Sequence, residues 1–395
     1  MQRARCARAG GYNLAVKRLA TLLIFAIAAP LSAQSSLQFY GFATAREIFV
    51  KAQPSWSTGG YGRFDVGADN SNDKAWVFVG NVQLGMDWTP STWFLLHADG
   101  IARKQQTGTI GDQFGLIQAF MDFRTQQVFR LRIGQFWLPT SRENIDPLWT
   151  SPYTITYSAW NSWMGQEVRP IGADLQISPS FYFSLGGTAF VGNDTMGTSL
   201  AAHGWTFGSR LSAYNEVIAA APATTRPFGT DIDHKIGDSE RIRLQMPERA
   251  MIQYTRLDNR ATVGSGGKPP NDPWHTQFDL VSASAGENSP TTLAGEWAKG
   301  KTTVGFPGGT FTLPFDTVYL LLSQKNKTDR WTARAEQFKA GKSKGHAYTV
   351  AWMRETNKTL RTGVEYSYAT GDQPTAPDPK TGGSTITVEL RYRFQ

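Results

Sequence analysis

The segment 384–394, close to the C-terminus, constrains the fold more than any other part of the chain. It reads STITVELRYRF. Apolar and polar side chains alternate strictly, which is the period of an extended strand and not of a helix. One face is apolar and ends in aromatics, and the other is charged, as in the closing strand of a transmembrane β-barrel, where lipid meets one face and a watery lumen the other. The apolar positions are Ile386, Val388, Leu390, Tyr392 and Phe394, and the polar ones are Thr387, Glu389, Arg391 and Arg393.

The same alternation recurs along the chain and predicts an all-β fold. Between Trp76 and Trp88 every second residue is apolar, and the two tryptophans are twelve residues apart. A strand of that length spans roughly 40 Å, so the two rings are expected at the two interfaces of one bilayer. Further strands are expected at 37–50, 93–102, 117–124, 128–138, 171–177, 181–189, 241–246, 250–256, 276–285, 291–299, 317–325, 331–338, 347–355 and 360–369.

The connections between these strands indicate an up-and-down meander. Long and short connections alternate, which is typical of an outer-membrane barrel with short periplasmic turns and longer outer loops. Both ends of such a barrel lie on one side, so the number of strands is even. If residues 204–214 belong to one long loop, the barrel has 16 strands; if a strand lies within 215–239, it has 18. We expect the antiparallel transmembrane barrel of 16.

The N-terminal residues predict a signal peptide. Five basic residues, the last of them Arg18, precede the apolar run Leu19–Ala29, which is too short to span a membrane. We place cleavage after Ala33, so residues 1–33 are the leader and 34–395 the barrel domain. The alternative is a buried N-terminal helix. An exported barrel belongs in the outer membrane, with outer-membrane lipid around it.

Removal of the leader changes the charge and the cysteine count. Its loss lowers the 40 Lys and Arg to 35 against 32 Asp and Glu, so the net charge falls from +8 to about +3. Nucleic-acid binding therefore loses its main support. Cys6, the one cysteine, leaves with the leader, so neither a disulfide nor a thiolate metal site is expected. We expect no cofactor.

One segment, about 140–168, departs from the hairpin rhythm. It contains Trp149, Trp160 and Trp163. So many aromatics are unusual in a solvated loop, and they predict a loop packed against the inner wall of the barrel, where it forms a constriction. The alternative is an outward loop folded on itself or against a neighbouring subunit.

Around this segment the chain resembles a known family. The sequence GQF-x-x-P at 134–139, Arg-x-x-Gly at 169–172 and YGF at 40–42 look like the outer-membrane porins grouped with phosphate-selective porins. The resemblance implies 16 strands, a homotrimer and a constriction formed by the loop after that strand. Two departures stand out. Gln395 follows the terminal aromatic, and residues 140–169 carry two arginines against three acidic residues, so phosphate selectivity is not carried over.

The function expected is passive diffusion of small hydrophilic or charged solutes, because charges that line a pore set its ion selectivity. For the narrowest point we expect Arg130 and Arg132 to face Glu143 and Asp146. The alternative is that such charges pair with neighbours across strands. The remaining expected pore-lining residues are Arg142, Arg169 and Asp174, and Trp149, Trp160 and Trp163 are expected to offer a stacking surface for sugars or aromatic acids.

Two other functions are alternatives to a diffusion channel. A barrel hydrolase needs a histidine beside a nucleophile or carboxylate. The five histidines lie in no recognisable motif, and the sequence contains no G-x-S-x-G, so we do not expect an enzyme. A purely structural barrel is the third possibility, but it has no use for a long inward loop. The histidines are His97, His203, His234, His275 and His346.

Overall fold

The fold is taken from a computed structural model of the chain. It describes residues 36–68, 73–103, 114–125, 128–191, 193–214, 216–220, 223–225, 230–264, 272–306, 308–372 and 380–394. The leader, residues 1–33, and Cys6 lie outside these ranges. Within them, helices are all too short or too polar to span a bilayer.

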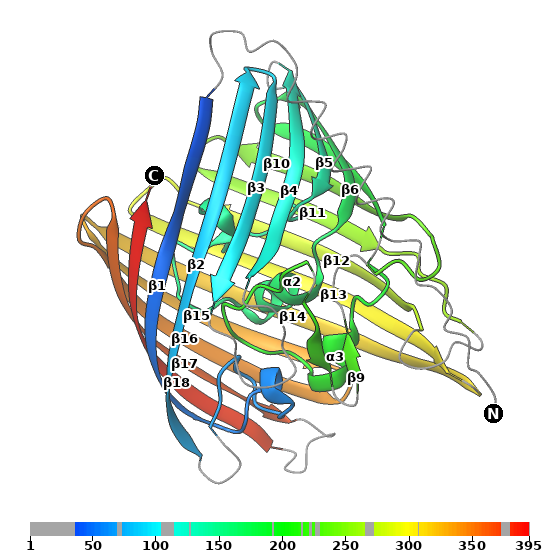
Figure 1. The fold of residues 1–395 in the computed structure, drawn as a ribbon, viewed down its shortest axis with the longest axis vertical. Helices are drawn as coiled ribbons and strands as arrows, with labels where there is room; N and C mark the ends of the chain where they lie inside the picture. Colours follow the sequence, from blue (N-terminus) through cyan, green and yellow to red (C-terminus); the bar gives the residue numbers. More distant parts are fainter. Residues whose placement is uncertain are drawn as a thin grey trace, which may run out of the picture.

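The described chain forms one closed antiparallel barrel of 16 strands, as the sequence predicts (Figure 1). β1 (Ser36–Ala52) closes the barrel, because it pairs with β2 (Lys74–Ser91) on one side and with β18 (Lys380–Phe394) on the other. The strands between are β3 (Phe94–Arg103), β4 (Phe114–Thr125), β5 (Phe129–Gln135), β6 (Ile171–Ser180), β7 (Phe183–Val191), β10 (Gly237–Met246), β11 (Ala250–Asp258), β12 (Trp274–Ala285), β13 (Thr291–Phe306), β14 (Gly309–Asn326), β15 (Asp329–Ala340), β16 (Ser343–Glu355) and β17 (Leu360–Asp372).

The uncertain middle of the sequence contributes no wall strand. Residues 204–214 run as irregular chain, and β7 pairs directly with β10. The short strands β8 (Ile218–Ala220) and β9 (Ala223–Thr225) pair only with each other. The alternative of 18 strands is therefore wrong.

Short connections gather at one end of the barrel, which we call the turn end; the other is the loop end. Both β1 and β18 have their chain-terminal residues at the turn end, where Gly41 pairs with Phe394. Two connections at the loop end, 307–308 and 341–342, are short, so long and short connections do not alternate at these two places. Before and after the first of them, β13 and β14 continue past their expected limits, Lys299 and Thr317, until Phe306 pairs with Gly309. Lys299 and Lys301 are exposed on this extension, so it suits water rather than lipid.

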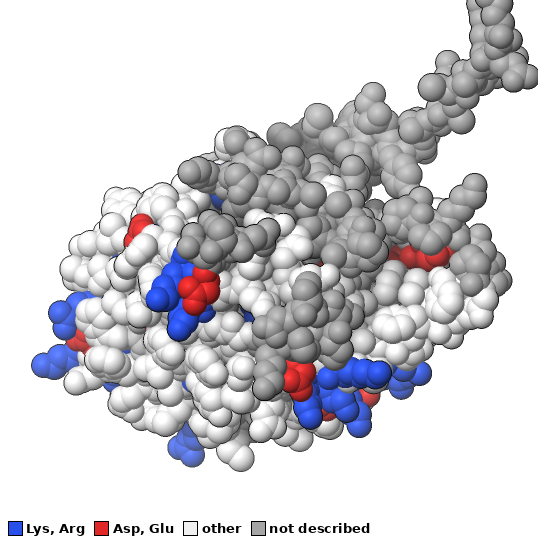
Figure 2. All heavy atoms as spheres, turned by 90° about the horizontal axis from the view of Figure 1, so that it is seen from below, with Lys and Arg blue, Asp and Glu red and all other residues white. Residues whose placement is uncertain are grey.

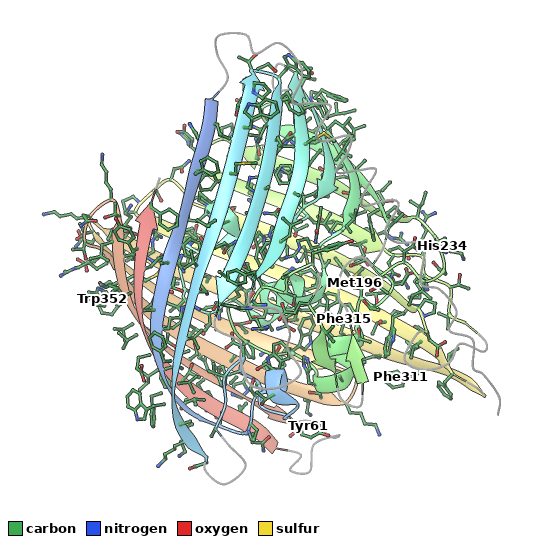
Figure 3. All side chains as sticks on the ribbon, viewed as in Figure 1. Tyr61, Met196, His234, Phe311, Phe315 and Trp352 are labelled. Atoms are coloured by element: carbon green, nitrogen blue, oxygen red, sulfur yellow. The ribbon has the colours of Figure 1, made fainter. Side chains whose placement is uncertain are left out.

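The two faces of the wall are sorted as the alternation predicts. On β18 the side chains of Val388 and Tyr392 are 51% exposed, whereas Glu389 and Arg391 are 1% and 4% exposed. Burial is thus the inverse of that in a water-soluble protein, with apolar residues outside and charges inside. In Figure 3, Trp352 lies at the outer margin and Phe315 near the centre of the barrel. Seen from below (Figure 2), the charged side chains form small groups separated by uncharged surface.

The outer face predicts a depth-dependent penalty for charge. Leu320, in the middle of β14, is 58% exposed on that face, and Gln324 lies four residues closer to the turn end on the same face. We expect Leu320→Arg to destabilise the folded barrel by about 2–4 kcal/mol and Gln324→Arg by less than about 1 kcal/mol. Unfolding in lipid vesicles by denaturant measures both. Equal penalties would contradict the assignment of this face to lipid.

Candidate pore constriction

The inner loop, residues 136–170, joins β5 to β6 and lies inside the barrel (Figure 1). It contains the short helix η2 (Pro147–Trp149) and α2 (Ala159–Glu167). α2 begins after Ser158, whose hydroxyl accepts a hydrogen bond from the Asn161 N–H at 3.2 Å. Serine is favoured at this position because it satisfies an N–H group that the helix leaves without a partner.

Carboxylates of the barrel wall hold this loop by its backbone. Glu365 of β17 accepts hydrogen bonds from the N–H groups of Ile155 and Thr156, the latter at 3.0 Å. Glu336 of β15 accepts the N–H of Ala159 at 2.8 Å, at the positive end of the α2 dipole. Glu296 of β13 accepts the Arg142 N–H and the Asn161 side-chain amide. The loop therefore lies on the inner face of β13–β17, the inward packing that the aromatic density predicts.

Arg334 of β15 links the wall and the loop electrostatically. Its guanidinium pairs with Glu143 of the inner loop and, at 2.6 Å, with Glu336. It also donates to the carbonyl of Thr156 at 2.8 Å. The Arg334 and Glu143 side chains are both fully buried. Burying charges is costly unless they are paired and hydrogen-bonded, so loss of either partner leaves an uncompensated buried charge.

This network predicts how the inner loop responds to mutation. We expect Glu143→Gln to lower the free energy of unfolding by about 3 kcal/mol, because Arg334 loses one of its two charge partners in a buried site. Glu355→Gln, which breaks a partly exposed pair with Arg393, is the matched control and should cost less than about 1 kcal/mol. Urea unfolding of detergent-folded protein measures both. Equal costs would show that Glu143 does not anchor the loop.

Burial corrects the expected role of two tryptophans. Trp160 and Trp163 are 1% and 2% exposed. The Trp160 ring lies 4.9 Å from that of Phe278, and the Trp163 ring lies 5.4 Å from that of Phe315, both on the inner wall. Rings enclosed by other rings offer no face to a solute. Trp149 stacks on Trp137 at 4.0 Å and still borders a cavity.

Two further segments enter the barrel and bind the inner loop. The N–H of Phe207 donates to the carbonyl of Arg63 at 2.6 Å, and the N–H of Tyr157 donates to the carbonyl of Gly208 at 3.0 Å. Glu167 at the end of α2 accepts N–H groups at the start of α3 (Thr198–His203) and the indole N–H of Trp163 at 2.7 Å. Burial raises the pKa of the Glu167 carboxyl, and these donors oppose the shift. The segments 53–68 and 193–214 were not expected inside, although Trp205 and Phe207 were a signal of the same kind as the tryptophans of the inner loop.

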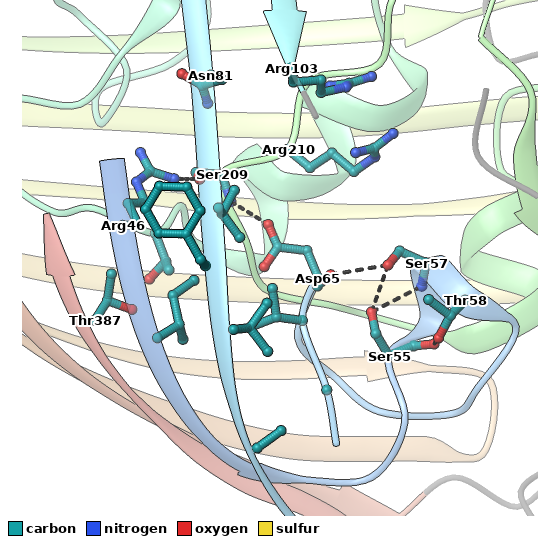
Figure 4. A pocket seen from close by; sticks show the side chains of 18 of the residues that line it. Arg46, Ser55, Ser57, Thr58, Asp65, Asn81, Arg103, Ser209, Arg210 and Thr387 are labelled. Carbon is teal, nitrogen blue, oxygen red and sulfur yellow. Dashed lines mark hydrogen bonds between the residues drawn. The ribbon is translucent and has the colours of Figure 1, made fainter. Parts of the chain in front are cut away.

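Beside these segments, the described residues enclose cavities, among them an outer and an inner chamber. The outer chamber, about 800 Å³, lies toward the loop end and is shown in Figure 4. Arg46 donates there to the hydroxyl of Ser209, whose N–H donates to Asp65 at 3.0 Å. Burial raises the pKa of the Asp65 carboxyl, against the opposing effects of this N–H and of the nearby arginines. Arg103 and Arg210 both pair with Glu216. Arg210 lies in irregular chain.

The inner chamber, about 430 Å³, lies toward the turn end. Its walls come from β3, β4 and β5 and from the first half of the inner loop. The Asp146 carboxyl, just before η2, makes no capping hydrogen bond, and burial raises its pKa while Arg361 opposes the shift. The lining residues are His97, Gln118, Phe120, Arg132, Trp137, Leu138, Pro139, Thr140, Ser141, Arg142, Asn144, Ile145, Asp146, Leu148, Trp149 and Glu287.

The ion pairs differ from those expected at the narrowest point. Arg130 and Arg132 pair with Asp122 of the neighbouring strand, not with Glu143, whose partner is Arg334. The reason is topological: β5 and β15 are eight places apart in a ring of 16, so the inner loop carries Glu143 across the whole lumen. Arg130 and Arg132 therefore follow the alternative expectation, in which charges pair with neighbours across adjacent strands.

The other expected pore residues are dispersed. Asp174 pairs with Arg241 at 2.6 Å on the inner wall. Arg169 is buried, where its guanidinium lies 4.6 Å from the Trp137 ring and donates to the carbonyl of Ser212. Arg142 reaches Glu287 at 3.7 Å. Arg132, Arg142 and Asp146 do border one chamber together.

One arrangement on the inner wall was not foreseen. The His97 imidazole lies between two carboxylates, with Nδ1 at 2.6 Å from Asp87 and Nε2 at 3.3 Å from Asp99. The Tyr40 hydroxyl lies 3.5 Å from the same Nδ1. His97 and Asp99 lie on β3 and Asp87 lies on β2, so the group forms no recognisable sequence motif and depends on the β2–β3 register.

The fold is similar to those of several solved outer-membrane proteins. The chain is similar to the anion-selective porin from Comamonas acidovorans, at 12% identity and a TM-score of 0.59 over 91% of this chain and 100% of that one. It is similar to the outer-membrane channel DcaP of Acinetobacter baumannii, at 10% identity and 0.59 over 92% and 98%. OmpT of Vibrio cholerae, in its trimer form, aligns at 8% identity and 0.54 over 91% and 99%.

Similarity at such low identity concerns the fold alone. No protein with a curated description matches the sequence at a significant level. The sequence profile of the family described as phosphate-selective porin O and P matches residues 59–303, which is more than half of the chain. This range includes the inner loop, the 193–214 segment and the wall from β2 to β12. The chain therefore belongs to the phosphate-selective porin O and P family.

Proposed function

We propose that the protein is a passive diffusion channel of the outer membrane for small hydrophilic solutes, with a preference for anions. The observation that carries the proposal is a closed barrel of 16 strands whose inner face is polar and whose lumen is narrowed by the inner loop, with the outer and inner chambers beside it. Barrels of this size enclose an aqueous channel. Passage through it needs no chemistry and no energy source.

The preference for anions rests on which charges meet water. The wall and loop carboxylates Glu143, Glu296, Glu336 and Glu365 are covered by the inner loop and are at most 3% exposed. At the turn end, by contrast, Asp122 is surrounded by three guanidiniums, and those of Arg124 and Arg130 are 51% and 33% exposed. An excess of exposed cations at a pore mouth concentrates anions and repels cations.

Reversal potentials test this proposal. In planar bilayers under a KCl gradient, we expect discrete ohmic steps and a higher permeability for Cl⁻ than for K⁺. The double substitution Arg124→Gln/Arg130→Gln should lower the ratio several-fold, because it removes the exposed positive charge. Arg354→Gln, on the outer face of β16, removes an exposed guanidinium away from the lumen and should leave the ratio unchanged. Cation preference in the unsubstituted protein would refute the selectivity, and a folded barrel without conductance would refute the channel.

We propose further that the mature chain begins at Gln34 and forms a homotrimer. The leader pattern supports the first part, and the trimer form of the structurally similar OmpT supports the second. Native mass spectrometry of protein extracted from outer membranes should give three identical chains, each lacking residues 1–33. A full-length chain would contradict the leader, and a single chain that persists across mild detergents would contradict the trimer.

We also propose that the barrel has no catalytic activity. His97 is the residue best placed for acid–base chemistry, since two carboxylates hold its ring. The hydroxyl next to it in the described structure is the Tyr40 phenol, at 3.5 Å. A hydrolase of the serine type needs an aliphatic hydroxyl hydrogen-bonded to the base. The His97 group is better explained as a rigid polar part of the chamber wall.

A further inference from the structure

The inner chamber contains two arginines whose charges are incompletely neutralised. The Arg132 guanidinium lies 4.4 Å from the centre of the Phe120 ring and reaches Asp122 at only 3.7 Å. Asp122 already accepts closer hydrogen bonds from Arg124 and Arg130. Arg142 is likewise 3.7 Å from its partner, Glu287. Arg132 and Arg142 are each 13% exposed, and both line the chamber.

The same chamber has buried polar atoms without partners. Asn144 is 5% exposed, and neither its amide nitrogen nor its amide oxygen is hydrogen-bonded within the described structure. The Nε atoms of Arg132 and Arg142 and the indole nitrogen of Trp137 share this condition. A buried polar group without a partner costs about 1–3 kcal/mol. Four of these five atoms are donors, so the side chains that border the chamber have more unused donors than acceptors.

The rest of the lining is apolar and partly aromatic. Leu138, Pro139, Ile145 and Leu148 border the chamber together with the Trp137–Trp149 stack. A strongly hydrated inorganic anion gains nothing from such walls, whereas an apolar or aromatic body gains from burial against them. Asp146 and Glu287 lie in the same lining. Their negative charge disfavours a polyanion. A single carboxylate that faces the two arginines carries less negative charge and is repelled less.

We propose that the inner chamber is a binding site for a small organic monocarboxylate that carries a ring, rather than for inorganic phosphate. The carboxylate would face Arg132 and Arg142, since guanidinium and carboxylate have matching geometry. The Asn144 amide, which turns on a broad terminal torsion, would bind a carboxylate oxygen or a substituent. The ring would lie against Trp149 and its apolar neighbours. A volume of about 430 Å³ is within the range of small-molecule sites.

This inference rests on the proposed channel function, and the experiment separates the two. Benzoate is the probe, with acetate and phosphate as comparisons. Calorimetry on the folded protein in detergent measures binding whether or not the barrel conducts, and inhibition of ion current in planar bilayers measures occupancy of the pore. We expect benzoate to bind and to inhibit the current at a concentration at least about tenfold lower than acetate or phosphate.

Two substitutions locate the site. Arg142→Gln should weaken benzoate binding by about tenfold, and the uncharged change Asn144→Ala should weaken it several-fold. Arg354→Gln, outside the lumen, is the matched control and should leave binding unchanged. Equal affinities for benzoate and acetate, tightest binding of phosphate, or benzoate binding that neither substitution weakens would each overturn the inference. Binding without conductance would overturn the channel function but not the site.

Discussion

The structure depends on the burial of wall carboxylates beneath a loop that supplies their hydrogen bonds. A closed barrel of 16 strands satisfies the hydrogen bonds of its own backbone, but it encloses a lumen that is too wide to be filled by side chains of the wall alone. The inner loop fills part of that space, and its own N–H groups then need acceptors. Glu296, Glu336 and Glu365 provide these acceptors at three strands. Arg334 balances the negative charge that this arrangement concentrates.

This anchoring also decides which charges a solute meets. Carboxylates that bind the loop are removed from water, whereas the arginines around Asp122 stay partly exposed. A count of charged residues in the loop alone gives a slightly acidic constriction. In the described structure Glu143 pairs with Arg334 of the wall and Glu167 binds the start of α3, whereas Asp146 borders the inner chamber. Selectivity in such a pore follows from the orientation of charges and not from composition.

The wall was predictable from sequence because the membrane imposes a local rule. Every second residue of β18 must face lipid, so the faces of Val388 and Glu389 could be assigned without knowing their neighbours. Contacts across the lumen follow no such rule. Glu143 comes eight residues after the β5 strand end at Gln135, yet its partner Arg334 lies on the opposite wall. No local pattern contains that information.

The tryptophans of the inner loop show a second limit of prediction from sequence. Their density correctly predicted a loop packed inward, but the same rings were also expected to contact solute. These roles exclude each other for Trp160 and Trp163, since a ring that fixes the loop to Phe278 and Phe315 has no free face. Trp149 can serve in both roles, because η2 places it at the edge of the aromatic cluster, where it stacks on Trp137 and borders the inner chamber.

The position of Trp149 links stability and selectivity in one segment. The first half of the inner loop lines the inner chamber, and residues 142–161 carry the hydrogen bonds to the wall carboxylates. A substitution that weakens the anchors therefore also displaces the chamber wall, and its effect on permeation does not identify a solute contact. Residues such as Asn144, which line the chamber but make no side-chain bond to the wall, are the positions where the two effects separate. Solute specificity in this fold can change most freely there, because the loop keeps its attachment while the lining is replaced.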